Sequence, residues 1–252
     1  MVKNFIHKNK LPDLTQKECE EYVCWLDLMG TKSLMERSPT SCTIKICQLH
    51  LCLSKNLSTL TSDIESLRLY PVMDGAFITA KNQTLLTNFL KSVFESMATD
   101  FIQEGGKDNH LYQSILRACI AYGPLGHGSD INTDEIPPNY KNSLLFGLPM
   151  SQAYSSEQKA PPFGIFIDKS ARAFSPPANK PFSTRWFIWF EKNYSQKKQL
   201  QEEVTKYFKW AKEKMSLCLP YDEETIEKHE KACIQYLNYY ESNPKSDISE
   251  EI

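Results

Sequence analysis

The chain has 252 residues, of which 41% are hydrophobic and 24% are charged, a composition typical of a folded globular protein. Its 29 Lys and Arg residues nearly balance its 31 Asp and Glu residues, and the net charge of −2 excludes an overall basic field that would attract nucleic acid or an anionic membrane. No apolar run approaches the roughly 20 residues of a membrane-spanning helix, and no apolar stretch follows the basic N-terminus, so we expect a cytoplasmic protein with neither nucleic-acid nor membrane partners.

Strands and helices are predicted to mix along the first two thirds of the chain. Residues 1–20 are polar and are expected to form an N-terminal arm. The apolar run at 22–26 predicts a buried strand that ends at Asp27, and a short helix then begins at Gly30 and stops before Ser38 and Pro39. The further predicted elements are a helix at 42–62, a hairpin of strands at 67–72 and 76–80, a helix at 82–103, a strand at 116–122, a loop at 123–140, a helix at 147–157, a strand at 163–168, a Pro-rich loop at 169–184 and a strand at 185–190. This order predicts an α/β fold, an α+β sandwich with a mainly antiparallel sheet that carries helices on one face.

The last third of the chain is rich in Lys and Glu. Helices are predicted at 195–216 and 222–241, followed by a tail at 242–252. We expect the segment 192–241 to pack on the preceding domain, and the Lys-rich part at 192–214 to form a solvated helix face that glutamates balance.

Two carboxylates stand where predicted strands end. Asp27 follows the first strand in WLDLMG, and Asp74 lies at the hairpin bend in VMDGAF. If the two strands are neighbours, both carboxylates project from the same sheet edge, and their mutual repulsion requires a cation such as Mg²⁺ or Mn²⁺. The carbonyl of Leu28 offers a further oxygen ligand, and the loop at Gly30 and Thr31 offers N–H groups for phosphates. The sequence therefore predicts a phosphoryl- or nucleotidyl-transfer site, the alternative being ordinary turn chemistry.

Arg117 in LRACIAYGPL is a charged residue in a mainly apolar strand, and it needs an anionic partner. A triphosphate fits the planar guanidinium, and a carboxylate on a neighbouring helix is the structural alternative. The chain contains neither a G-x-x-x-x-G-K-[ST] loop nor a G-x-S-x-G elbow, which leaves a P-loop NTPase and a serine hydrolase of that type unsupported.

The cysteines and histidines offer weaker candidates. Cys42, Cys47 and Cys52 recur every five residues with His50 among them, but this spacing is wrong for a zinc knuckle, and we expect buried free thiols and no disulfides. We expect His127 to be a solvated loop residue and His229 to lie on the surface of its helix.

Four motifs occur in order: WLDLMGTKSLM, YPVMDGAFITA, LRACIAYGPLGHG and LLFGLPMSQAYSSEQ. Together they resemble the signature of class III nucleotidyl cyclases. FGLPMSQAYSSEQ, GIFID, WFIWF and KHEKACIQYLNYY resemble, more narrowly, the stand-alone bacterial pyrimidine cyclases of Pycsar antiphage defence. The resemblance covers about residues 20–241 and implies a class III cyclase-like catalytic domain at 21–191.

The resemblance implies a lyase that converts UTP or CTP to 3′,5′-cyclic UMP or cyclic CMP and pyrophosphate. In that family two Mn²⁺ or Mg²⁺ ions activate the ribose 3′-hydroxyl for in-line attack on the α-phosphorus. Each active site uses both subunits of a homodimer, and a separate effector reads the cyclic nucleotide as an antiphage signal. We expect the same arrangement here.

The family roles fall on particular residues of this chain. Asp27 and Asp74 match the metal-binding aspartates, with the Leu28 carbonyl beside them, and Arg117 matches the position that contacts the triphosphate. Purine cyclases place a base-reading Lys or Glu four residues before the second aspartate. This chain has Tyr70 there, which is similar to the pyrimidine cyclases and leaves UTP and CTP both open.

The chain also departs from the family pattern. Ser151 and Ser155 stand where purine cyclases carry an Asn and the transition-state Arg, while Met73 and Ala118 replace two usual glycines. These departures leave open a slow enzyme, another donor in place of the transition-state Arg, or a catalytically degenerate cyclase-like module that binds a nucleotide or a partner. A different metal-dependent phosphotransferase that uses the same carboxylates is a further alternative.

Overall fold

The computed structural model describes residues 19–60, 66–108, 110–131, 135–177, 179–213 and 221–242. The predicted arm at 1–20 and tail at 242–252 lie almost wholly outside the described residues, as do Cys218 and the end of the helix predicted at 195–216. The arm is shorter than expected, because Cys19 and Glu20 already belong to the first strand.

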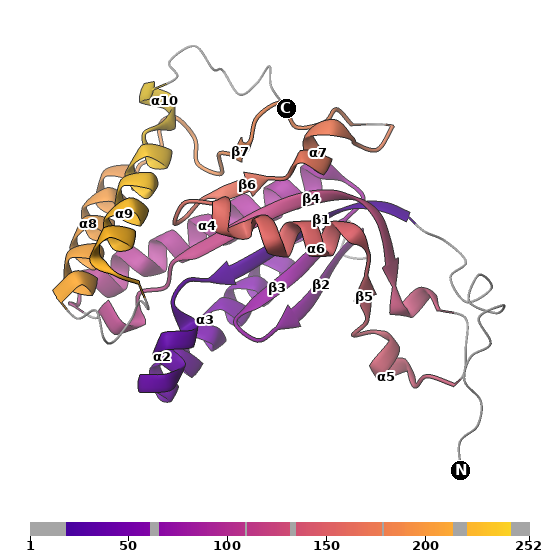
Figure 1. Cartoon of the computed structure of the whole chain (residues 1–252), viewed down its shortest axis with the longest axis horizontal. Coiled ribbons are helices and arrows are strands. Elements are labelled where there is room, and N and C mark those ends of the chain that lie inside the picture. The colour runs from indigo at the N-terminus through magenta and orange to yellow at the C-terminus, as the bar shows by residue number, and fades with distance from the viewer. Residues whose placement is uncertain are drawn as a thin grey trace.

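A mixed sheet crosses the centre of the molecule (Figure 1). Its strands are β1 (Cys19–Leu28), β2 (Leu67–Val72), β3 (Gly75–Ala80), β4 (Leu116–His127), β5 (Leu145–Phe146), β6 (Ile165–Ile167) and β7 (Trp186–Phe187). The order is β2-β3-β1-β4-β6-β7, with β5 paired to the far end of β4. Only the β4–β6 pair is parallel among these strands, so the expected mainly antiparallel sheet is confirmed.

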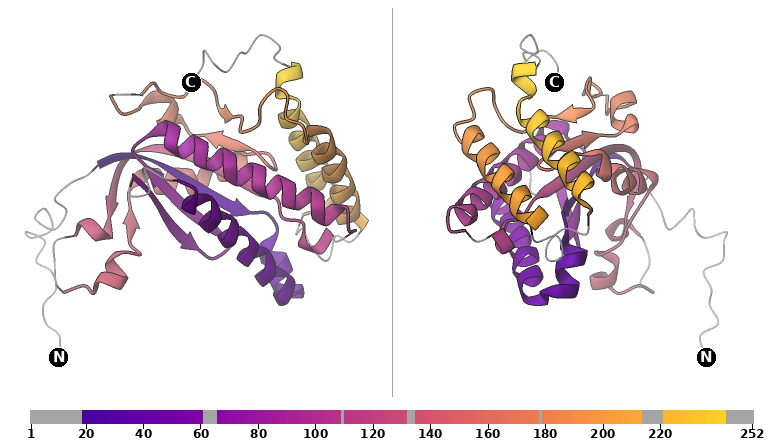
Figure 2. Two further views of the ribbon diagram at one scale, coloured as in Figure 1. Left: turned by 180° about the vertical axis from the view of Figure 1, so that it is seen from behind. Right: turned by 60° about the vertical axis from the view of Figure 1, so that its left-hand side comes forward.

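Helices cover both faces of this sheet. They are α2 (Thr31–Arg37), α3 (Pro39–Ser58), α4 (Gln83–Gly105), α5 (Pro138–Lys141), α6 (Leu148–Ser156), α7 (Lys169–Ala173), α8 (Lys197–Glu213), α9 (Glu223–Leu237) and α10 (Tyr239–Ser242), with 3-10 turns η3 (His110–Tyr112), η4 (Gly128–Asp130) and η5 (Glu157–Lys159). Helices α3 and α4 lie on one face (Figure 2, left), whereas α6 packs on β1 and β4 from the other. The prediction of helices on one face only is therefore wrong, although the α/β class is confirmed. No helix in the described ranges is both long and apolar enough to cross a membrane.

The alternation of side chains along β1 explains the two layers. Tyr22, Cys24, Leu26 and Leu28 belong to the large core under α3 and α4. Val23 and Trp25 point the other way, into a smaller cluster under α6. Since successive side chains of a strand face opposite sides, Glu21 and Asp27 share the α6 side with Val23 and Trp25.

Local signals set several helix boundaries. The side chain of Asn82 accepts a hydrogen bond of 3.0 Å from the Leu85 N–H group, so Asn82 is the expected N-cap of α4. Helix α3 begins at Pro39, earlier than the predicted Cys42, because proline is favoured in a first helical turn, where its missing N–H group has no partner to lose.

Several strands differ from their predicted lengths: β1 and β4 are longer than predicted, and β6 and β7 are shorter. β4 continues through Gly123 to His127, a stretch expected to be loop, and bends at its far end to pair with β5 (Figure 1). The apolar run at 185–190 forms only the two-residue β7, after which Trp189 is held by a 2.7 Å hydrogen bond from its indole N–H group to the Phe163 carbonyl. An apolar run indicates that its side chains are buried, and the side chains of this segment are buried without forming a strand.

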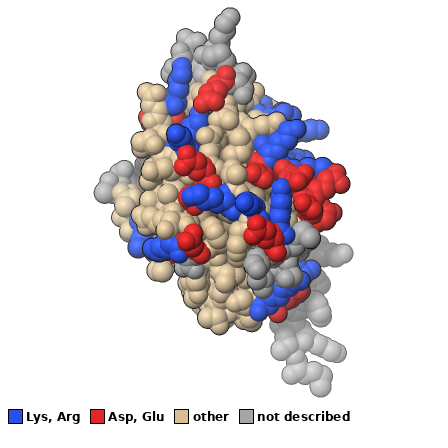
Figure 3. All heavy atoms as spheres, turned by 90° about the vertical axis from the view of Figure 1, so that its left-hand side faces the viewer, with Lys and Arg blue, Asp and Glu red and all other residues tan. Residues whose placement is uncertain are grey.

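The C-terminal helices combine a core face with a charged outer face. Leu200, Val204 and Phe208 of α8 belong to the same core as the sheet. On the outside, Lys212 lies 3.1 Å from Glu227 and basic and acidic side chains are interspersed (Figure 3). The described part of the 192–214 segment is thus the balanced, solvated face that we expected.

Candidate active site

The sheet register brings Asp27 and Asp74 together. Asp27 pairs with Gly75 across β1 and β3, and Asp74 immediately precedes Gly75 in the hairpin. Val72 pairs with Gly75 across β2 and β3, so Met73 and Asp74 form the turn, with Met73 at a φ of 51°. The predicted turn dipeptide is shifted by one residue, since Gly75 already belongs to β3.

Electrostatics at this pair favour a bound proton or a cation. Burial, followed by the charges of Asp74 and Glu157, raises the pKa of Asp27 to about 8, and the opposing charge of Arg117 only partly offsets this. The Thr31 hydroxyl donates a hydrogen bond to Asp74 Oδ2. A hard divalent cation suits these oxygen donors, and the repulsion within the pair is what such an ion relieves, so the residues fit Mg²⁺ or Mn²⁺. Within the described residues, no group of three or more His, Cys, Asp or Glu side chains gathers as a complete protein cage.

A cavity of about 760 Å³ opens beside the two aspartates. Its mixed lining consists of the charged and polar Asp27, Thr31, Lys32, Glu36 and Asp74 and the apolar or aromatic Trp25, Met35, Ile46, Val72, Met73 and Tyr154. Such a space suits a ligand with both a polyanionic and an apolar part.

The predicted phosphate loop lies at the edge of this cavity. Gly30 adopts a left-handed conformation with φ of 81° directly before α2. Thr31 is buried and its hydroxyl donates a hydrogen bond to Asp74, while Lys32 is exposed and lines the cavity. Leu28 contributes its backbone here, because its N–H group donates to the Asp74 carbonyl at 3.3 Å and its side chain faces the core. A phosphate-binding role for Gly30 and Thr31 and a metal-binding role for the Leu28 carbonyl stay predictions.

Arg117 has an internal carboxylate partner. Its Nε atom lies 2.6 Å from Glu157 Oε1, and the two side chains are only 8% and 6% exposed. This is the helix-carboxylate alternative, with Glu157 placed just beyond α6. Arg117 also pairs with Asp27 in the β1–β4 register, which places the ion pair beside the aspartates. Contact between Arg117 and a triphosphate stays a prediction.

Tyr70 lies apart from the carboxylate cavity, on the same face of the sheet. It packs with Trp25 and Phe77 in the cluster under α6. Its hydroxyl lies 2.5 Å from Nδ1 of His127, and Nε2 of His127 lies 3.2 Å from Glu21 Oε2. The expectation of a solvated His127 is wrong, because the bend of β4 turns this residue inward to 2% exposure.

Sequence reasoning overlooked Glu157, which lies beside the aspartates, and Glu21, which contacts His127. A signal for Glu21 exists in the two-residue period of β1, which places it on the face of Asp27. Nothing local distinguishes Glu157, because its role depends on Arg117, which lies 40 positions earlier in the chain.

The remaining histidine and cysteine candidates do not form a site. Cys42 and Cys52 are buried on α3, while Cys47 is exposed, and the thiols of the described cysteines are free. His229 is half-buried, where we expected it on the surface, and burial together with the charge of Arg117 lowers its pKa to about 4.

The departures from the cyclase pattern lie on α6. Ser151 and Ser155 are exposed, and the Ser155 hydroxyl donates to the Gln152 carbonyl at 3.3 Å. The ring of Tyr154, between them, lies 5.4 Å from the Trp25 ring at an interplanar angle of 58°, and Tyr154 lines the carboxylate cavity.

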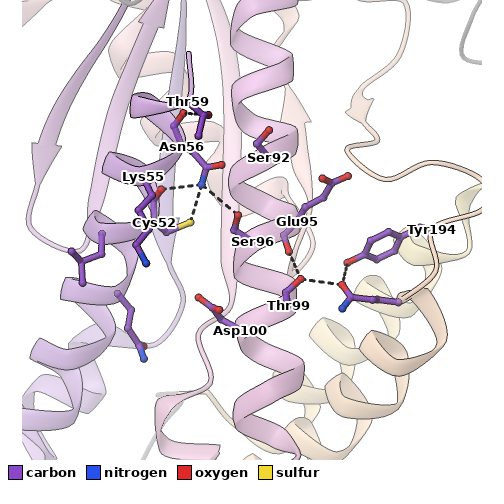
Figure 4. Close-up of a pocket in the computed structure, with 13 residues that line it drawn as sticks. Cys52, Lys55, Asn56, Thr59, Ser92, Glu95, Ser96, Thr99, Asp100 and Tyr194 are labelled. Atoms are coloured by element: carbon purple, nitrogen blue, oxygen red, sulfur yellow. Dashed lines mark hydrogen bonds between the residues drawn. The ribbon is translucent and has the colours of Figure 1, made fainter. Parts of the chain in front are cut away.

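A groove of about 730 Å³ lies between α3 and α4, away from the aspartates (Figure 4). Asn56 donates to Cys52 and Ser96 there, and Thr99 donates to Gln196. These bonds tie neighbouring elements together, and we assign the groove no catalytic role.

Comparisons with known proteins give distant structural likenesses. No protein-family model matches the chain, and no curated protein matches it. Among solved structures, it is similar to the guanylyl cyclase domain of the RhoGC fusion protein from Blastocladiella emersonii (13% identity, TM-score 0.44, 60% of this chain and 80% of that one). It is also similar to adenylate cyclases from Trypanosoma brucei in their monomeric state (12%, 0.45, 63% and 77%) and to the guanylate cyclase domain of RhGC from Catenaria anguillulae in complex with GTP (14%, 0.45, 61% and 80%).

Proposed function

We propose that this protein is a metal-dependent nucleotide cyclase that converts UTP or CTP to the 3′,5′-cyclic monophosphate and pyrophosphate. The observation that carries the proposal is the pair Asp27 and Asp74, which the β1–β3 register brings together beside a cavity of about 760 Å³. The order of the four cyclase-like motifs along the sequence supports the same function.

The chain's own residues divide the work between binding and positioning. Asp27, Asp74 and the Leu28 carbonyl would hold two Mn²⁺ or Mg²⁺ ions, which supply charge neutralisation at the triphosphate and activation of the 3′-hydroxyl. Lys32, exposed at the cavity, adds a positive charge for the phosphates. The buried ion pair of Arg117 and Glu157 lies beside Asp27 and would hold its carboxylate in position before the substrate binds.

A homodimer is part of the proposal. Met73 is 83% exposed and Tyr154 is 61% exposed, and both line the cavity beside the aspartates. Large apolar side chains that are exposed around a polar site favour contact with a second protein surface. A second copy of this chain would complete the site, as in the resembled family.

The biological setting follows from the resemblance. A cyclic pyrimidine nucleotide would act as a second messenger in antiphage defence, and a separate effector that binds the cyclic nucleotide would respond to it. The protein itself would then need no nucleic-acid or membrane partner.

The decisive experiment incubates the purified protein with Mn²⁺ and each of the four ribonucleoside triphosphates and identifies the products by mass. We expect a cyclic pyrimidine monophosphate, which disappears in Asp74→Ala. The exposed Glu202→Ala on α8 removes one carboxylate far from the site and is the control that keeps activity. Activity retained in Asp74→Ala, with the fold verified by circular dichroism, would overturn the site.

A binding module without turnover is the second candidate, and Ser151 and Ser155 on α6 favour it because neither side chain stabilises a developing negative charge as an arginine does. In that case a pyrimidine nucleotide raises the melting temperature while no product forms on long incubation.

A further inference from the structure

A second cavity, of about 430 Å³, is lined by residues of η5, β7 and α9 and of the segments next to them. It shares no lining residue with the cavity beside Asp27 and Asp74. Its volume falls within the range of about 300–1,000 Å³ that is usual for small-molecule sites. This space, which we call the η5–α9 cavity, is therefore large enough to hold a ligand of its own.

The Lys and Arg residues of the η5–α9 cavity have no acidic counterpart in its lining. Lys159, Arg185 and Lys228 are exposed and line it, whereas no Asp or Glu of the described ranges does. Lys228 is paired with Glu224 at 2.7 Å, but Lys159 and Arg185 make no ion pair with any residue that the structure describes. In a chain whose net charge is −2, this local excess of positive charge favours an anionic ligand.

Uncharged neighbours hold the two unpaired cations in place. The Arg185 Cζ atom lies 5.5 Å from the centre of the Trp186 ring, and the Lys159 Nζ atom lies 5.4 Å from the centre of the Phe166 ring. Lys159 Nζ also donates a 3.2 Å hydrogen bond to the Ser156 hydroxyl. Such contacts restrict a side chain without neutralising its charge. Less conformational entropy is therefore lost when these cations bind an anion.

Aromatic and amide side chains supply the other part of the lining. Trp186 and Tyr239 are half-buried and Tyr236 is 5% exposed, so that their rings offer a largely fixed apolar surface. Planar bases pack well against such rings. Gln158 and Gln235 are exposed, and an amide can both donate to and accept from the edge of a base or a ribose hydroxyl. The lining thus suits a ligand that joins an anionic group to a planar polar ring.

We propose that the η5–α9 cavity is a binding site for a nucleoside monophosphate, with Lys159 and Arg185 at the phosphate and the aromatic side chains against the base. This site is separate from the aspartate cavity. It requires no metal ion, and it does not depend on the proposed cyclase reaction.

Titration of AMP into the full chain in EDTA tests where a nucleotide binds. AMP is the probe because its large purine ring offers the most stacking surface. The indole ¹H–¹⁵N resonance of Trp186, assigned with Trp186→Phe, should shift as AMP is added. The resonance of Trp25, which lines the aspartate cavity, should stay in place. A shift of Trp25 without a shift of Trp186 would overturn the proposal.

Two charge-removing variants test the phosphate contacts. Calorimetry should show that Lys159→Gln and Arg185→Gln each weaken AMP binding about tenfold, the effect of one lost hydrogen bond to a charged group. Lys209→Gln is the matched control, because it removes an exposed lysine of α8 outside the cavity, and its affinity should equal that of the wild type. An affinity unchanged in both cavity variants, or no binding of AMP to the wild type, contradicts the inference.

Fragments of AMP test both halves of the proposal on the wild-type protein, so the outcome does not depend on whether a variant folds. Adenosine lacks the phosphate and ribose 5-phosphate lacks the base, and each should bind at least about tenfold more weakly than AMP. Ribose 5-phosphate that binds as tightly as AMP would show a general anion site. Adenosine that binds as tightly would show a site without a role for the cations. Either result overturns the proposal, whether or not the protein is a cyclase.

Discussion

Asp27 and Asp74 lie side by side across the edge of β1 and β3, where burial and the second carboxylate raise the pKa of Asp27 to about 8. Without a metal ion, Asp27 therefore retains a proton at neutral pH, and a divalent cation could take the place of that proton. This relationship yields the first two predictions.

Without divalent cations, stability should fall as the pH rises. A carboxyl group with a pKa raised from about 3.9 in the unfolded chain to about 8 in the fold binds its proton more tightly when folded. Its contribution is complete below about pH 4 and is lost as the pH rises through about 8. The melting temperature of Asp27→Asn in EDTA should therefore exceed that of the wild type by an amount that grows between about pH 4 and 8. A difference that does not change with pH would contradict the raised pKa.

Binding of Mn²⁺ at neutral pH should release close to one proton per site. Asp27 with a pKa of about 8 is mostly protonated at pH 7, and a metal ligand must be ionised. Calorimetric enthalpies in two buffers of different ionisation enthalpy give the number of protons directly. Release should vanish well above pH 8 and in Asp27→Asn. Equal enthalpies in both buffers at pH 7 would show that no proton leaves.

The buried ion pair of Arg117 and Glu157 should be sensitive to loss of one partner. Arg117→Ala leaves Glu157 as an uncompensated buried charge, which costs about 3–5 kcal/mol of unfolding free energy in chemical denaturation. Lys228→Ala is the control, because it breaks the exposed Lys228–Glu224 pair of 2.7 Å and should cost less than about 1 kcal/mol. Similar losses of unfolding free energy in the two variants would show that the buried pair is no more sensitive to the loss of one partner than the exposed pair.

Gly75 should tolerate no side chain. A Cβ atom there would collide with the Leu26 carbonyl oxygen and lie 2.7 and 2.8 Å from carbon atoms of the Trp25 ring. Gly75→Ala should cost about 1–3 kcal/mol and displace Asp74, so metal affinity should fall as well. Gly106→Ala, whose Cβ atom would find its nearest neighbours at 3.6 Å, is the matched control and should leave both quantities nearly unchanged. Metal affinity unaltered in Gly75→Ala would show that the turn adapts.

Local patterns predicted most of the fold around the site. The N-cap at Asn82, the short helix after Gly30 and the hairpin strands at 67–72 and 76–80 were readable because capping, turn residues and alternation act over a few residues. The length of β4 and the brevity of β7 were not readable, since both depend on which strand lies alongside.

By itself, the sequence indicated the two carboxylates near strand ends and an α/β architecture, and the β1–β3 pairing of the tertiary structure decided that the two carboxylates lie together. Only the tertiary structure decided the partners of the other polar residues. Arg117 meets Glu157, and His127, expected in solvent, is enclosed between Glu21 and Tyr70. The reason is physical: strand and turn preferences arise from neighbouring residues, whereas a buried polar group is satisfied by whatever the fold brings to it from elsewhere in the chain.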